Sequence, residues 1–195
     1  MELSLFPLNT VLFPGGVLPL RIFETRYIDM VRHCLRTDAP FGVILIREGT
    51  EVAGPAGPAR IHAVGTWGRI VDWDQRPDGL LGITVQGEAR FRVERTWVRK
   101  DGLMMGEVAE LPTSPDVLLP PEFLPLSELL QRLLQELPPP YRDMKGAFDR
   151  CGWVGGRLTE LMPLDPDQKQ ALLEMDDHLA RLFHLRDALV GLHPG

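Results

Sequence analysis

The sequence contains few of the residues that build disulfide frameworks or hydrolytic sites. Only two of its 195 residues are cysteine, Cys34 and Cys151, which excludes a disulfide scaffold and fits a reducing cytoplasm. Three residues are serine, and none of them lies in a Gly-x-Ser-x-Gly motif. The sequence also has no Gly-x-x-x-x-Gly-Lys-Ser/Thr phosphate loop, which excludes an ATPase of that class.

Long apolar runs and an excess of positive charge are missing as well. No apolar run approaches the roughly 18 residues of a membrane span, and the first residues lack the basic segment of a signal peptide. We therefore expect a cytoplasmic protein with no membrane partner. The formal net charge is −6, whereas a strong nucleic-acid binder needs a basic surface. Nucleic acid is therefore an unfavoured partner.

No arrangement of residues predicts catalysis, a metal site or a cofactor. None of the five histidines forms a His-x-x-x-His pair or accompanies a Cys-x-x-Cys motif. His33 and Cys34 are adjacent on a predicted helix, where they point about 100° apart, so we expect a surface histidine and a core cysteine. Asp72 and Asp74 could act as a carboxylate pair only if burial separated their pKa values, and only Trp73 suggests burial.

Prolines divide the chain into two parts. Five prolines between 112 and 125 predict a stiff connector between a strand-rich domain, 1–111, and a helical subdomain, 126–195. We expect the helical subdomain to pack on the strand-rich domain or on a partner. The fold class is therefore mixed α+β, and 18 prolines and 19 glycines favour short elements over a simple helical bundle.

The strand-rich domain is expected to form an antiparallel barrel. Three stretches are typical of strands: 41–46, 61–73 and 80–85. Gly87-Glu88 predicts a tight hairpin turn, and the Gly/Pro-rich stretch 49–58 predicts a mobile loop. One inserted helix, 25–35, carries an apolar stripe and has Thr25 as a candidate cap. Because strands do not alternate with helices, a doubly wound parallel sheet is disfavoured.

The second part of the chain predicts helices. Leucines from 126 to 137 form a dense stripe with Ser127 as a candidate cap, and three prolines end that helix. A second helix is expected over 141–151 and a short one around 154–161. The last helix has Asp165 as its N-cap and Gln168 in the capping-box position, and its stripe continues to Leu189.

Several motifs follow in a fixed order along the chain. They are Leu5-Phe6-Pro7-Leu8, Val11-Leu12-Phe13-Pro14-Gly15, Leu18-Pro19-Leu20-Arg21-Ile22-Phe23-Glu24, Arg26-Tyr27, Phe41-Gly42-Val43, Val64-Gly65-Thr66, Asp78-Gly79, Arg90-Phe91, Leu161-Met162-Pro163-Leu164 and Leu172-Leu173-Glu174. In these motifs the chain resembles the N-terminal substrate-binding domain of the Lon proteases, a domain that cereblon carries in a related form. The resemblance covers nearly the whole chain.

The resemblance implies a PUA-like pseudo-barrel followed by a helical subdomain. It also implies a bacterial, non-catalytic protein-binding module related to proteolysis. The sequence ends at Gly195 without an ATPase or Ser/Lys protease module, so we expect a free-standing substrate-binding domain. The partners implied are unfolded or apolar protein segments, with a protease or a chaperone as further partners, and a homo-oligomer is left open.

Six of the seven candidate binding residues lie in or near the most specific motif, and the seventh, Trp73, lies at the end of a predicted strand. The seven residues are Phe13, Pro14, Arg21, Phe23, Glu24, Tyr27 and Trp73. A Phe-Pro-Gly-Gly turn can direct the Phe13 ring outward, although core packing is the ordinary role of such a ring. Arg21 and Glu24 are expected to form an internal ion pair, or else to contact a ligand. Pro19 predicts an edge strand, which can accept an extended peptide by strand addition.

Two other functions stay open. An RNA-binding module of PUA-like fold would be supported only by the basic run from Arg90 to Lys100, which is balanced by neighbouring acidic residues and is typical of a solvated strand face. A small-molecule hydrolase with an unfamiliar site is the other alternative. Binding to an unfolded protein, salt-dependent RNA binding and turnover of model substrates distinguish the three hypotheses.

Overall fold

The computed structural model describes residues 1–51, 59–75 and 77–191. The chain divides into two compact units, Met1–Pro112 and Thr113–Gly195. Most of the loop predicted over 49–58 lies outside the described residues. No helix in the described ranges is long and apolar enough to cross a membrane.

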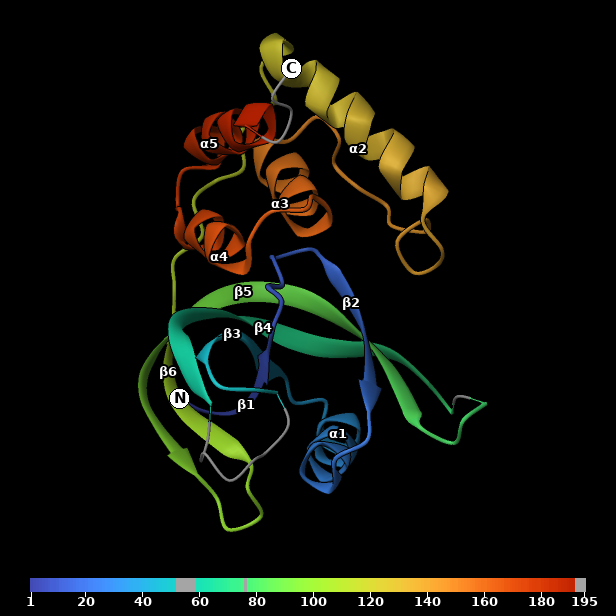
Figure 1. Ribbon diagram of the computed structural model, residues 1–195, viewed down its shortest axis with the longest axis vertical. Helices are drawn as coiled ribbons and strands as arrows, with labels where there is room; N and C mark the ends of the chain where they lie inside the picture. Colours follow the sequence, from blue (N-terminus) through green and yellow to red (C-terminus); the bar gives the residue numbers. More distant parts are fainter. Residues whose placement is uncertain (52–58, 76, 192–195) are drawn as a thin grey trace. The chain divides into compact units, whose positions relative to one another are not determined.

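Among its described residues, the first unit contains six strands and one long helix (Figure 1). They are β1 Glu2–Leu8, β2 Val17–Ile22, α1 Thr25–Thr37, β3 Phe41–Glu48, β4 Arg60–Gln75, β5 Leu81–Val98 and β6 Met104–Glu110. The strand order is β2-β5-β4-β3-β1-β6, and β5 also pairs with β6. Strands β5, β4, β3, β1 and β6 therefore form a closed hydrogen-bonded circuit, and β2 is attached to β5 outside it.

The prediction of a purely antiparallel sheet is wrong. β1 pairs with β3 in parallel, with Leu5 opposite Gly42 and Leu8 opposite Leu45. The remaining strand pairs are antiparallel. Between β1 and β3 the chain runs through β2 and α1, and such a crossover returns the chain in its starting direction.

The predicted hairpin at Gly87-Glu88 is also wrong, because β5 continues straight through both residues. A Cβ on Gly87 would lie 2.3 Å from the carbonyl oxygen of Phe13. The Gly87 amide donates to Gly16 O at 2.9 Å, and the Gly15 amide donates to Gly87 O at 2.8 Å. The glycine therefore allows the turn before β2 to lie directly against β5.

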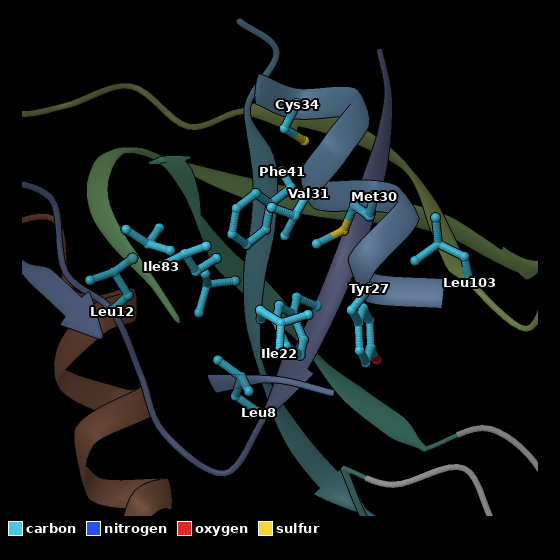
Figure 2. Packing of buried hydrophobic residues seen from close by; sticks show 13 residues of the cluster. Leu8, Leu12, Ile22, Tyr27, Met30, Val31, Cys34, Phe41, Ile83 and Leu103 are labelled. Carbon is cyan, nitrogen blue, oxygen red and sulfur yellow. The ribbon is translucent and has the colours of Figure 1, made fainter. Parts of the chain in front are cut away.

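Two apolar clusters fill the first unit. The larger cluster packs α1 against the strands, with Tyr27, Met30, Val31 and Cys34 facing residues of β1, β2, β3 and β5 (Figure 2). The smaller cluster surrounds Phe91, which is fully buried. These side chains match the apolar stripe and strand positions of the sequence, and Cys34 lies in the core as expected.

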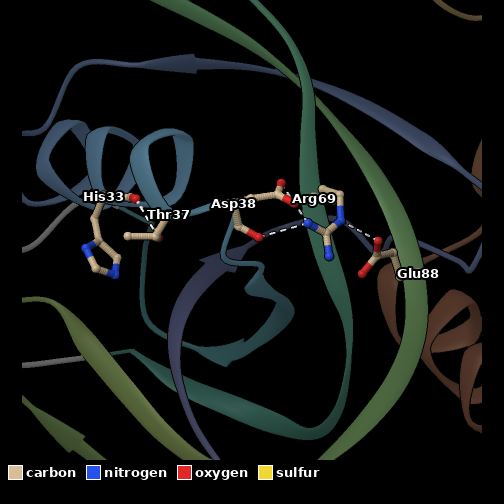
Figure 3. A network of polar contacts seen from close by, with 5 residues as sticks. All are labelled: His33, Thr37, Asp38, Arg69 and Glu88. Carbon is tan, nitrogen blue, oxygen red and sulfur yellow. Dashed lines mark hydrogen bonds and ion pairs between the residues drawn. The ribbon is translucent and has the colours of Figure 1, made fainter.

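Charged residues connect the end of α1 to β4 and β5. α1 ends at Thr37, and its C-cap residue, Asp38, has a left-handed φ of 53°. Arg69 of β4 pairs with Asp38 at 2.8 Å and with Glu88 of β5 at 2.6 Å (Figure 3). Hydrogen bonds to Glu88 and Asp38 raise the pKa of Arg69. At the other end of α1, Thr25 is the first helical residue and not the cap, a position that Glu24 occupies without a side-chain bond.

The second unit is helical. Its elements are a 3₁₀ turn at Pro121–Phe123, α2 Leu124–Glu136, α3 Cys151–Leu161, α4 Pro166–Glu174 and α5 His178–Gly191. Within the leucine stripe, Leu130 and Leu134 are buried in α2. Ser127 does not cap this helix, which begins at Leu124. It lies buried inside α2, where its hydroxyl donates to Phe148 O at 2.7 Å.

Two other helix predictions for this unit are wrong. Residues 141–150 form turns and irregular structure, and α3 begins at Cys151. The last predicted helix is two helices, because the Asp177 carboxylate accepts the Leu179 and Ala180 amides at 2.9 Å and starts α5 afresh. The capping box of Asp165 and Gln168 is confirmed at the start of α4.

The segment after Pro112 contacts the helices of the second unit. Asp116 accepts the Gly152 and Trp153 amides at 2.6 and 3.2 Å, so its carboxylate caps α3 from a distant part of the sequence. The Leu119 amide donates to Asp149 O at 2.8 Å, and the Cys151 amide donates to Val117 O at 3.0 Å. These bonds hold residues 116–119 of the Pro-rich segment beside the start of α3.

Candidate binding surface

The turn before β2 is folded inward. The Phe13 side chain is only 2% exposed, so the turn does not direct this ring outward, and the ring packs in the core, its ordinary role. The Gly16 amide donates to Phe13 O at 3.0 Å, and Gly15 has a φ of 78°. Pro14 is half-buried. The turn therefore packs against the core at the start of β2.

The charged residues around β2 do not pair as the sequence predicts. Arg21 forms its ion pair with Asp78, in the turn between β4 and β5, and Glu24 pairs with Arg26 at 3.0 Å. The Arg21–Glu24 pair is therefore wrong, because Arg21 lies in a strand whose register places it opposite Gly82, close to that turn. Arg26 also donates to Gly102 O at 2.9 Å, so it connects α1 to the turn before β6.

Tyr27 belongs to the core and also to the wall of a hollow. Its ring stacks on Phe6 at a centroid distance of 4.0 Å, and the Arg26 guanidinium lies 4.6 Å from its centroid. Burial raises the pKa of the Tyr27 hydroxyl to about 12, with Arg26 opposing the shift and Glu24 adding to it. The hydroxyl therefore stays protonated over the physiological pH range.

A hollow of about 280 Å³ lies beside β2, and we call it the edge hollow. Its lining residues are Phe6, Leu8, Pro19, Leu20, Arg21, Ile22, Phe23, Glu24, Tyr27 and Glu51. Apolar side chains come from β1, β2 and α1, and two carboxylates and one guanidinium are the charged groups of the lining. The hollow suits an apolar side chain brought in by another molecule.

A second hollow of about 450 Å³ lies between α1 and the paired strands β4 and β5, which together form the β4–β5 ribbon. We call this hollow the ribbon groove. Its lining includes Ile28, Arg32 and Leu35 of α1, Trp73 of β4, Leu81 of β5, and Phe23 in the connection between β2 and α1. Phe23 is 57% exposed, Trp73 is 59% exposed and Leu35 is 43% exposed. Large apolar side chains that border a shared hollow and face solvent are typical of a binding surface.

The structure brings together five of the seven predicted binding residues. Arg21, Phe23, Glu24 and Tyr27 line the edge hollow, and Phe23 and Trp73 line the ribbon groove. Phe13 and Pro14 line neither. Leu35 of the ribbon groove was missed because its position in the apolar stripe of α1 is also typical of a core residue.

The described residues offer no metal site, since no group of three or more His, Cys, Asp or Glu side chains among them could hold an ion. Burial raises the pKa of the Cys34 thiol to about 11, so the thiol stays protonated at neutral pH, and His33 is exposed. Asp72 and Asp74 are exposed on β4, where the Asp72 carboxylate accepts the Trp73 amide at 2.9 Å. None of these groups has the environment of an activated nucleophile or base.

Three arginines of the basic run from Arg90 to Lys100 contact other groups of the protein. Arg90 is buried and donates to Pro112 O at 3.4 Å. Arg95 pairs with Glu107 at 3.3 Å, and Arg99 pairs with Asp101 at 2.8 Å. Charges that are paired within the fold attract phosphates less than free cations do, so this face does not favour RNA binding.

Comparison with known proteins decides the family. The family model of the substrate-binding domain of ATP-dependent protease La (Lon) matches residues 2–190. The chain belongs to the Lon substrate-binding domain family. Lon protease 2 of Myxococcus xanthus is 28% identical to it over 186 residues, which are 92% of this chain and 22% of that protein. The chain therefore spans about a fifth of the length of the Lon protease.

Solved Lon domains share the fold. A Lon N-terminal domain protein from Xanthomonas campestris is 40% identical, with a TM-score of 0.76 over 100% of this chain and 99% of that one. The N-terminal domain of a Mycobacterium avium complex Lon protease has a TM-score of 0.61 at 18% identity, over 96% of this chain and 97% of that one. The resemblance to the Lon substrate-binding domain that the sequence motifs indicated is thus confirmed.

Proposed function

We propose that this chain is a non-catalytic module that binds unfolded or apolar segments of protein substrates and presents them for proteolysis. Its family binds substrates, and the sequence contains no phosphate loop with which to hydrolyse ATP. Acting as an adaptor for a protease or chaperone in the cytoplasm is part of this proposal. Self-association and packing of the helical unit on the barrel or on a partner also remain proposals.

The observation that carries the proposal is the ribbon groove, with Phe23 and Trp73 exposed at it. A folded protein hides its large apolar side chains, whereas an unfolded one exposes them together with extended backbone. Aromatic side chains beside an apolar hollow offer a large contact area at a low entropic cost. Such a surface therefore favours unfolded polypeptides over folded ones.

The test compares binding of one reduced, alkylated protein with binding of its folded, disulfide-bonded form. We expect binding of the unfolded form alone, and each of the variants Phe23→Ser and Trp73→Ser should weaken it by about 1–3 kcal/mol. Val98→Ser is the matched control, since Val98 is exposed on β5 and lines neither hollow. Equal affinity for the two forms, or equal loss in all three variants, would contradict the proposal.

A further inference from the structure

Among the described residues, β2 pairs with one strand only. All six of its residues face β5, from Val17 opposite Gln86 to Ile22 opposite Leu81. In the strand order β2 is therefore an edge strand, as Pro19 predicts. The backbone groups on its other side are not used by a neighbouring strand, and such an edge is a template for another chain.

The hydrogen-bond pattern shows which groups face that open edge. The Gly87 amide donates to Gly16 O, so the residue before β2 points its carbonyl toward β5. Alternate residues of an antiparallel strand point their backbone groups to opposite sides. Leu18, Leu20 and Ile22 therefore bond β5, whereas Val17, Pro19 and Arg21 direct their backbone groups outward. The open edge offers three carbonyls and two amides, since Pro19 has no N–H.

The edge hollow lies along this open edge, and it supplies the specificity that backbone bonds lack. Pro19, Leu20, Arg21 and Ile22 all line it, opposite side chains of β1 and α1 such as Leu8 and Tyr27. Ile22 is only 1% exposed, which shows that the face shared by Leu20 and Ile22 is the core-facing side. In an added strand, the residues opposite Leu18 and Leu20 would point to this same face.

The proline at the centre of β2 disfavours a second copy of this chain as the occupant. Two β2 strands paired edge to edge would bring two Pro19 residues into one ladder. Because proline has no N–H, each Pro19 would leave one carbonyl of the opposite strand without a hydrogen-bond donor. A segment of another polypeptide has an N–H at every position except proline. When it pairs with β2, only its one carbonyl facing Pro19 lacks a donor. The occupant that suits this edge is therefore a segment of another polypeptide.

We infer that β2 binds substrate by strand addition. This inference rests on the proposed function and specifies that the bound segment is extended. An extended segment pairs with the outward groups of Val17, Pro19 and Arg21. Its residues opposite Leu18 and Leu20 are apolar and point to the core-facing side, where Leu20 lines the edge hollow. The residue opposite Pro19 donates its own N–H to the Pro19 carbonyl, so that position of the substrate excludes proline.

The experiment uses a labelled peptide of about seven residues, close to the length of β2, in which leucine and threonine alternate between terminal lysines. Its leucines point to the side of the edge hollow, and its threonines turn their N–H groups toward β2. N-methylation of the central threonine removes a bond to β2, so binding should weaken about tenfold. N-methylation of the adjacent leucine is the matched control, since that N–H faces away from β2, and it should change binding less than about twofold.

The outcomes separate this inference from the proposed function. Equal effects of the two methylations, or no effect of either, overturn strand addition while peptide binding itself still supports the proposed function. A peptide that does not bind at all also overturns strand addition, and the unfolded-protein assay then decides the proposed function independently. If the protein forms concentration-dependent dimers that dissociate when the peptide is added, a second copy of this chain is the occupant of the edge. That result overturns the inference.

A protein variant tests the same edge from the other side. Arg21→Pro removes an outward N–H, and Arg21→Ala removes the same ion pair with Asp78 while keeping that N–H. We expect Arg21→Pro to bind the peptide about tenfold more weakly than Arg21→Ala. Equal affinities of the two variants, at equal stability toward urea, overturn strand addition. Should Arg21→Pro fail to fold, the two methylated peptides decide the question with the unaltered protein.

Discussion

At the scale of single residues, Arg21 and Glu24 show what a sequence can and cannot predict. Both were expected to form ion pairs, and both do, but with Asp78 and Arg26. The need of a charged group for a partner follows from its chemistry. The identity of the Arg21 partner depends on the register between β2 and β5, which no local pattern of residues reveals.

Gly87 has the tightest backbone contact described around β2. In Gly87→Ala, the added Cβ would lie 2.3 Å from Phe13 O and push the turn away from β5, which should cost about 1–3 kcal/mol of stability. Urea unfolding measures this loss. Gln86→Ala, at the exposed neighbouring position, should change the stability by less than about 0.5 kcal/mol. An alanine at 87 that leaves the stability unchanged would show that the turn can move freely.

Tyr27 predicts a loss of stability in alkaline solution. Burial raises its pKa from 10.0 to about 12, so above pH 10 the unfolded chain loses a proton that the folded protein keeps. The free energy of unfolding therefore falls as the pH rises through 10, by about 1.4 kcal/mol at pH 11 from this residue. Urea titrations at pH 8 and 11 measure the fall.

Tyr27→Phe separates this contribution from others, such as that of Cys34, whose pKa is raised in the same direction. The variant should lose about 1.4 kcal/mol less than the unaltered protein between the two pH values. An equal loss in both proteins would mean that the hydroxyl ionises as easily in the folded state as in the unfolded one.

At the scale of elements, the sequence predicts helices and strands correctly where a single local pattern determines the structure. The stripe of α1 and the capping box at Asp165 are local signals. The capping box was interpreted correctly, and so was the stripe except at Leu35, which is exposed. β5 was divided at Gly87 because a glycine before an acidic residue is typical of a hairpin. The structure uses that glycine for a close approach of Phe13, a contact 74 residues away in the sequence.

The candidate site was predictable to a similar extent. Phe23 and Trp73 were chosen from a family motif and from a strand end, and the structure places both at the ribbon groove. The groove itself could not be predicted, since it requires the packing of α1 beside the β4–β5 ribbon. For the same reason Leu35 was not distinguished from the core residues of its helix.

The start of α3 depends on a residue outside the helix. Asp116 accepts two amides there, so Asp116→Ala should destabilise the helical unit by about 1 kcal/mol. Urea unfolding followed by the circular dichroism of the helices measures this effect. Asp143→Ala removes an exposed carboxylate of the same unit that caps no helix, and it should be neutral. Equal losses in both variants would indicate an effect of net charge and not of capping.

At the scale of the whole molecule, the chain divides into two compact units. Residues 1–112 contain all strands of the circuit. Two hydrogen bonds also hold the end of this unit, since Arg90 donates to Pro112 O and the Leu111 amide donates to Arg90 O. We therefore expect residues 1–112, produced alone, to unfold cooperatively in urea and to bind the same unfolded protein as the full chain. A fragment that lacks a cooperative transition would show that the first unit requires the helical one.

The strand circuit also sets an order for folding during synthesis. Of these strands β1 leaves the ribosome first, and its neighbours are β3, more than thirty residues later, and β6, about a hundred residues later. At synthesis rates of roughly 5–20 residues per second, β1 waits several seconds for its second neighbour. During that interval β3, β4 and β5 can pair as a meander. A nascent chain stalled before Met104 should therefore expose β1 to chaperones and proteases, and release past Glu110 should protect it.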